Sequence, residues 1–188
     1  MGGTHIEESV FSSPLKSFLR RVPWLYVNLF TALIAASVVG LFTETIVAAA
    51  TVAVFMPMVA GMGGNAGTQT LALIVRGIAL GEVTLKDTWR VLLKQISVGF
   101  LTGIAIGILT ALIAFLWKGN PVMCLVVGIA LVINIVTACT FGALIPLTLK
   151  KLRLDPALGS GIFITATTDA VGFLVFLSLA TLFIKFLK

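Results

Sequence analysis

One acidic residue, Asp169, lies deep inside an apolar stretch of the sequence, whereas the other six lie in the polar N-terminal tail or in expected loops and turns. If a helix begins at Pro156, Asp169 lies about 20 Å along it, within reach of the centre of a bilayer. No lysine or arginine in a neighbouring apolar stretch is placed to neutralise the carboxylate. A charged side chain at that depth costs at least ~2.5 kcal/mol, so we expect Asp169 to face water, an ion or a partner. A structural aspartate that accepts hydrogen bonds from neighbouring hydroxyls is the alternative.

Small and hydroxyl-bearing residues accompany Asp169 at helical spacing. Gly161, Thr165 and Gly172 fall roughly on its face, and Thr168 is adjacent. Small residues let water or another helix approach closely, and hydroxyls and backbone carbonyls supply the oxygen ligands that a hard cation accepts. The pattern predicts a metal site at Asp169 with these residues as its surroundings, although Gly and Thr also serve helix packing in membranes.

A second polar cluster lies in the apolar stretch 46–80, which is too long for one straight crossing. Pro57 and the glycines after it are expected to unwind or kink the middle of this stretch. A broken helix exposes backbone carbonyls that can line a cation pathway, although a kink that only serves packing is the competing interpretation. If this stretch and the last one run in opposite directions, its middle lies at the depth of Asp169. The expected lining residues of this stretch are Gly61, Gly64, Asn65 and Gln69.

The composition places the chain among membrane proteins. Hydrophobic residues make up 59% and charged residues 11% of the 188 residues, and the mean hydropathy of +1.16 excludes a soluble domain. The apolar runs are long and do not alternate, which favours helices over a β-barrel. We therefore predict an all-α integral membrane protein: five transmembrane helices, the second broken, form a pore domain over residues 22–188. A cytoplasmic tail with a short interfacial helix is expected in residues 1–21. The expected spans are residues 22–41, 46–80, 86–116, 121–149 and 156–186.

The basic residues predict the orientation of these spans. With five spans, ten of the thirteen Lys and Arg residues fall on one side of the membrane. The positive-inside rule then places the N-terminus in the cytoplasm and the C-terminus outside a multi-pass protein of the plasma membrane. The net charge of +6 follows from this topology and does not indicate nucleic-acid binding. The three basic residues on the other side are Lys118, Lys185 and Lys188.

Three glycines, Gly99, Gly103 and Gly107, repeat every fourth residue in the third apolar stretch. This spacing is typical of close helix contact in membranes. We assign these glycines to packing.

Taken as a set, the two polar clusters resemble the transmembrane domain of the MgtE family of magnesium channels. The set pairs Pro57-x-x-x-Gly61-x-x-Gly64-Asn65-x-Gly67-x-Gln69 with Thr167-Thr168-Asp169-x-x-Gly172, and it includes Arg21-Val22-Pro23-Trp24 and Asp155-Pro156-Ala157. The resemblance covers about residues 20–188. It implies a homodimer with a pore at the subunit interface, lined by the second and fifth spans. It also implies a largely hydrated Mg²⁺ as the transported ion, with weaker or inhibitory binding of Mn²⁺ or Ca²⁺.

The residues agree with that expectation on chemical grounds. Mg²⁺ sheds water reluctantly and is typically held by one or two carboxylates. Two symmetric copies of Asp169 could hold a hydrated dication, whereas one acid per chain cannot build a cage for a bare ion. Glu44, at the expected outer turn, either concentrates cations at the outer mouth or is a solvated turn residue without function.

Two features depart from the family pattern. Family members usually carry a large cytoplasmic region, an N domain with paired CBS modules, and nothing in residues 1–21 can fold into it. We therefore expect a form without these domains, whether naturally short or trimmed. Some relatives carry an asparagine where this chain has Gly161, which predicts a thinner polar shell here.

Two other functions remain open. In a proton- or sodium-coupled carrier of divalent cations, Asp169 would bind the coupling ion. In a non-transporting membrane subunit, the polar faces would bind a protein partner. An enzyme is not expected, because no Ser/His pair, paired acids or metal-ligand cluster accompanies Asp169 within the apolar stretches.

Overall fold

The computed structural model describes residues 11–156 and 159–187, and within these ranges it contains helices and no strand. The all-helical prediction is therefore confirmed. The elements in chain order are α1 (Pro14–Gly40), α2 (Thr43–Ala48), α3 (Thr51–Ala79), the 3-10 helix η1 (Leu85–Asp87), α4 (Thr88–Lys118), α5 (Pro121–Lys151), α6 (Ser160–Leu182) and α7 (Ile184–Leu187).

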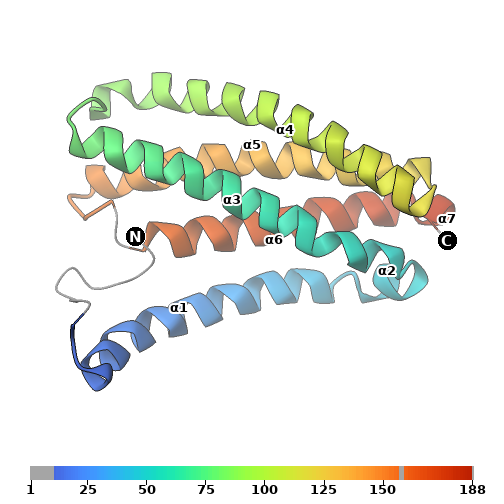
Figure 1. Ribbon diagram of the computed structural model, residues 1–188, viewed down its shortest axis with the longest axis horizontal. Helices are drawn as coiled ribbons and strands as arrows, with labels where there is room; N and C mark the ends of the chain where they lie inside the picture. The colour runs from blue at the N-terminus through green and yellow to red at the C-terminus, as the bar shows by residue number, and fades with distance from the viewer. Residues whose placement is uncertain (1–10, 157–158, 188) are drawn as a thin grey trace.

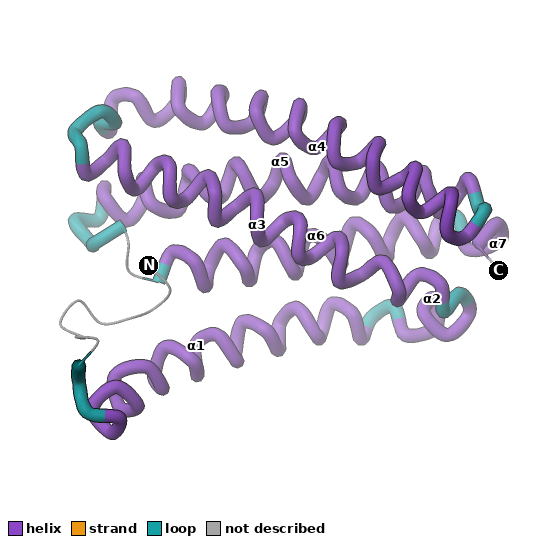
Figure 2. The backbone as a smooth tube through the Cα atoms, viewed as in Figure 1, coloured by secondary structure: helices purple, strands orange, loops and turns teal. Residues whose placement is uncertain are grey.

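The long helices lie side by side and alternate in direction along the long axis of the molecule (Figure 1). Helix α5 is central: it packs against α3, α4 and α6, and it supplies much of the fully buried core. Helix α1 packs mainly against α6 at the edge of the bundle. Figure 2 shows that the connections between the long helices are short, so consecutive helices form antiparallel neighbours or near neighbours.

Four helical segments of the described chain are long and apolar enough to cross a membrane. They are α1, the continuous segment Leu85–Lys118 formed by η1 and α4, α5, and α6. Multiple spans are thus supported by length and composition. Helix α3 is not one of the four within the described ranges, because glycines and polar residues lower the hydropathy of its middle.

The break predicted near Pro57 in the second span is not found in the structure. It is helical without interruption through Pro57 and the glycines that follow, and the chain leaves helical geometry earlier, at Ala49, where φ is −139° and ψ is 77°. Some of its glycines are packing sites. A Cβ at Gly63 would clash with the side chain of Asn134, and one at Gly67 would clash with Ile164. Without side chains there, α5 and α6 approach the α3 backbone closely.

The expected interfacial helix is also corrected over the described residues. Residues 14–21 are the first turns of α1, which continues through Pro23. A proline inside a helix removes one backbone hydrogen bond, and here that loss does not end the helix. Residues 1–10 of the predicted tail lie outside the described residues.

The packing role of the α4 glycines is confirmed. A Cβ at Gly107 would lie 2.9 Å from the carbonyl oxygen of Gly128, and one at Gly103 would lie 3.0 Å from the Cα of Val132. A Cβ at Gly99 would lie 3.0 Å from the Cβ of Cys139. Any larger side chain at these positions would push α4 away from α5.

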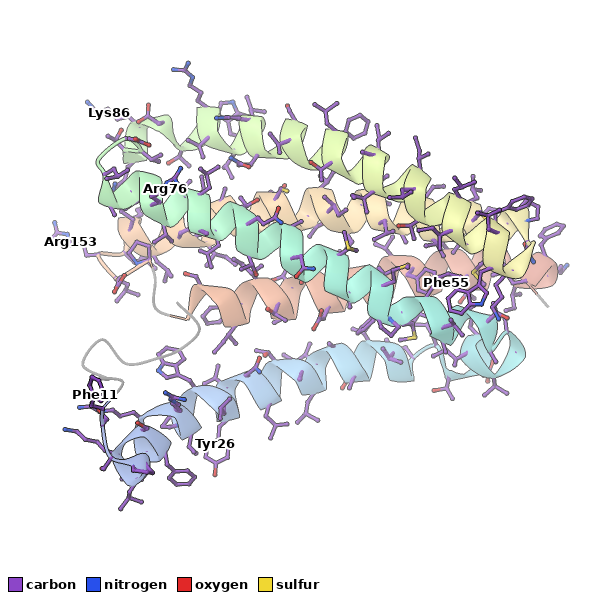
Figure 3. All side chains as sticks on the ribbon, viewed as in Figure 1. Phe11, Tyr26, Phe55, Arg76, Lys86 and Arg153 are labelled. Carbon is purple, nitrogen blue, oxygen red and sulfur yellow. The ribbon has the colours of Figure 1, made fainter. Side chains whose placement is uncertain are left out.

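Basic residues gather at one end of the bundle. Figure 3 shows Arg76, Lys86 and Arg153 at the end where α3 finishes and α4 begins. Lys150 and Lys151 end α5 at the same end.

Candidate ion site

Asp169 lies near the middle of α6 and is partly exposed. Within the described residues its carboxylate takes part in no hydrogen bond or ion pair. The same part of the chain contains no group of three or more His, Cys, Asp or Glu side chains that could enclose a metal ion. A single chain therefore presents one open carboxylate rather than a closed coordination shell.

Two hydroxyl groups lie within the helical turn that precedes Asp169. Thr165 is exposed and its Oγ1 donates to the carbonyl oxygen of Gly161 at 3.0 Å. Thr168 is fully buried and donates to the carbonyl oxygen of Thr165 at 3.0 Å. Each hydroxyl hydrogen is used within the helix, so the oxygen lone pairs remain to accept hydrogen bonds from water around a cation. Only Thr165 can do so from the surface.

Helix α3 has two different small-residue faces. Gly61 and Gly64 face open space, since a Cβ at either would meet no atom within 4 Å. Asn65 and Gln69 are exposed on this same side, together with Thr68. We call these five residues the α3 polar stripe. It contrasts with the glycine face described above, which packs on α5 and α6.

Asn134 of α5 joins α3 to α6 and was not singled out by the sequence analysis. Its side chain is fully buried, and its Nδ2 donates to the carbonyl oxygen of Val59 at 2.9 Å. The amide also fills the space beside Gly63, and a Cβ at Gly172 would lie 2.6 Å from its Nδ2. Gly172, expected near the site, is thus buried against this amide. The available signal was one asparagine in a strongly apolar helix, which is unusual in a membrane.

Contacts between α3, α5 and α6 place the α3 polar stripe and Asp169 at similar positions along the long axis of the bundle. The side chain of Asn134 lies between Gly63 of α3 and Gly172 of α6, so these two glycines are at one depth along the bundle. Gly67 of α3 lies against Ile164 of α6, which gives a second pair of residues at equal depth. Because α3 and α6 run in opposite directions (Figure 1), Asn65 and Asp169 both lie between or close to these two depths. No hydrogen bond joins their side chains in the described ranges. The chain therefore places them at similar depth without bringing them into contact.

Glu44 lies apart from these residues. It is exposed on α2, at the end of the bundle opposite to the basic residues (Figure 1). The neighbouring Thr45 shares a 2.8 Å hydrogen bond with Thr181, which ties α2 to the last turn of α6. Glu44 is therefore positioned at one end of the bundle.

The exposed polar groups in the middle of these helices need a partner other than lipid. Amide, hydroxyl and carboxylate groups are costly against hydrocarbon, so they face water, an ion or another protein in a membrane. Among the described residues these groups are the partly exposed carboxylate of Asp169 on α6 and the α3 polar stripe.

Comparisons with known proteins show which family the chain resembles. A family model described as a divalent cation transporter, MgtE, matches residues 56–179, which include the α3 polar stripe and Asp169. A magnesium transporter MgtE of Bacillus subtilis is 36% identical over 165 residues, which cover 88% of this chain and 37% of that protein. The proteins of the same name from Enterococcus faecalis and Thermus thermophilus are each 33% identical, over 99% and 98% of this chain. The chain spans about two fifths of the length of these relatives, 41% for the latter two.

Proposed function

Because the chain belongs to the MgtE family of divalent cation transporters, we propose that it conducts Mg²⁺ across a membrane along the α3 polar stripe and Asp169. The observation that carries the proposal is the carboxylate itself: it is partly exposed in mid-helix and has no protein partner in the described residues. A cation can neutralise it there, whereas lipid cannot.

The pathway requires α3 to be a fifth span. Its 29 residues correspond to about 43 Å of helix, enough to cross a bilayer. It packs between candidate spans, against α5 and α6. Its lower hydropathy is the expected property of a helix with one face in water.

The pathway also requires a second copy of the chain. Two-fold symmetry about an axis beside α3 and α6 would bring a second Asp169 and a second α3 polar stripe to the first. Two carboxylates with amide and hydroxyl oxygens can hold Mg²⁺ through its water shell. Selection then depends on the size of the hydrated ion, with Mn²⁺ and Ca²⁺ as weaker competitors.

Glu44 would concentrate cations at the outer mouth. The basic end of the bundle would face the cytoplasm, which puts the start of α1 inside and the end of α6 outside the plasma membrane.

Flux measurements test the proposal. We expect purified protein in liposomes to pass Mg²⁺ down its gradient at constant pH, with a conductance that needs no proton or sodium gradient. Asp169→Asn and Asp169→Ala should abolish this flux, because both remove the charge that the ion neutralises. Glu44→Gln, which removes one acid at the mouth, should reduce the rate at low Mg²⁺ and keep it at saturating Mg²⁺.

The outcomes separate the alternatives. Wild-type flux from Asp169→Asn would remove the central assignment. Flux that occurs only with a proton or sodium gradient would identify a coupled carrier, and a wild-type protein without any flux would favour a non-transporting subunit.

A further inference from the structure

A pocket of about 360 Å³ lies at the basic end of the bundle, between η1 with the start of α4 and the end of α5. Leu85, Leu144 and Leu147 form its apolar part. Its polar lining consists of Thr88, Thr148 and Lys151. The α5 residues recur at three- or four-residue spacing, so one face of the helix runs from apolar to cationic toward its end.

The depth of the pocket matches the boundary between lipid headgroups and acyl chains. Helices α4 and α5 have 31 residues each, about 46 Å of helix. A bilayer is about 40–45 Å thick with its headgroups and about 30 Å without them. The last turn of α5, with Lys151, therefore reaches headgroup level, and Leu144 lies about 10 Å deeper. Trp89, beside the pocket residue Thr88, is 69% exposed, as expected of an aromatic residue at the interface.

The charge around the pocket is positive. Lys151 is exposed, and no hydrogen bond or ion pair engages its ammonium group among the residues described. Lys150 donates to the carbonyl oxygen of Val83 at 2.7 Å, which holds a second positive charge nearby. Asp87, next to the pocket residue Thr88, accepts hydrogen bonds from the backbone N–H of Thr84 at 3.0 Å and from its hydroxyl at 2.6 Å.

We propose that this pocket binds an anionic phospholipid, with the phosphate at Lys151 and the upper acyl chain on Leu85 and Leu144, beside the buried Leu147. Basic pockets between transmembrane helices are suited to such headgroups. Thr88 and Thr148 now donate to the carbonyl oxygens of Leu85 and Leu144, each at 2.8 Å. A phosphate oxygen is a stronger acceptor, so either hydroxyl can rotate toward it.

A lipid fits this pocket better than a soluble phosphate does. A free phosphate would contact Lys151 and leave Leu85 and Leu144 uncovered, whereas a phospholipid covers both parts at the depth where the bilayer supplies it. The proposal depends on membrane insertion alone and is independent of ion conduction, so either can fail without the other.

Native mass spectrometry of the full chain tests it. The protein in detergent is mixed with equal amounts of phosphatidylglycerol and phosphatidylcholine that carry the same acyl chains. We expect preferential retention of phosphatidylglycerol. Lys151→Gln should lower that retention about fivefold, the factor that corresponds to one basic residue beside an anionic lipid. Lys118→Gln is the matched control, because it removes the same charge from an exposed site at the opposite end of α4.

A second variant tests the pocket rather than its charge. Thr148→Trp fills the space and keeps Lys151, and it should also reduce retention of phosphatidylglycerol. Each variant is compared with the wild type by helical circular dichroism and elution volume. Loss of folding in Thr148→Trp leaves Lys151→Gln, at an exposed position, as the deciding variant.

Three results would overturn the proposal. The first is equal retention of the two lipids by the wild type. The second is an equal loss in Lys151→Gln and Lys118→Gln, which would indicate diffuse attraction. The third is displacement of the lipid by glycerol 3-phosphate at equal concentration, which would identify a soluble phosphate ester as the ligand.

Discussion

Replacing Gly172 with alanine should destabilise the bundle by about 2 kcal/mol. The added Cβ would lie 2.6 Å from Nδ2 and 3.0 Å from Cγ of Asn134. The amide of Asn134 cannot move away easily, because it already contacts Gly63 and donates a hydrogen bond to the carbonyl oxygen of Val59. The substitution therefore forces α6 away from α5 or breaks the hydrogen bond.

The magnitude follows from three contributions. Inserting a methyl group into a packed core costs about 1–3 kcal/mol. Loss of the hydrogen bond of Asn134 adds about 0.5–1.5 kcal/mol. Alanine is a better helix former than glycine by about 1 kcal/mol, which offsets part of the cost.

Unfolding in mixed micelles, measured by circular dichroism without divalent cations, gives the free energy of unfolding. Gly40→Ala is the control, since a Cβ at this exposed glycine of α1 meets no atom within 4 Å. We expect Gly40→Ala to leave the free energy of unfolding unchanged or to raise it by up to about 1 kcal/mol.

A double-mutant cycle identifies the cause. Asn134→Ala removes the amide that the new methyl group would strike, so Gly172→Ala should cost less in that background. We expect a coupling energy of about 1–3 kcal/mol between the two sites. Equal stability of Gly172→Ala and Gly40→Ala, or a coupling energy below about 0.5 kcal/mol, would refute the reasoning.

Two further predictions concern a turn and the ion. Arg153, in the turn after α5, has a φ of 61°, a left-handed conformation that costs a non-glycine residue about 1–2 kcal/mol. Arg153→Gly should therefore raise the free energy of unfolding by about 1 kcal/mol relative to Arg153→Ala, and equal values for the two variants would contradict this origin of strain. Mg²⁺ at a hundred times its dissociation constant should stabilise the wild type by about 2.7 kcal/mol in thermal unfolding. Asp169→Asn should lose this increment and keep at least the ion-free stability, because no hydrogen bond or ion pair within the described part of the chain is lost; an unchanged increment would place the ion elsewhere.

The sequence predicts the features that depend on local composition. Long apolar runs indicate membrane helices, and Asp169 stands out because every other acid lies in the expected tail, loops or turns between these runs. The glycines of α4 could be assigned to packing because regular four-residue spacing has few other uses.

Features that depend on distant neighbours escape such reasoning. Gly63 and Gly64 are adjacent and chemically identical, yet one packs on Asn134 and the other faces open space. This difference depends on α5, which lies far along the chain. The break predicted near Pro57 was wrong: α3 is helical without interruption there and packs against α5 and α6. Asn134 bonds to Val59, 75 residues away, so its partner cannot be read from local pattern.

The order of the helices along the chain has a consequence for biogenesis. Helix α3 leaves the ribosome before α5 and α6, the two helices that cover its glycine face. On its own it is a poor substrate for the translocon, since its middle is rich in glycine, asparagine and glutamine. If α3 is the fifth span proposed above, its stable integration has to await the synthesis of its later neighbours, and a chain truncated before α5 should be a target for membrane quality control.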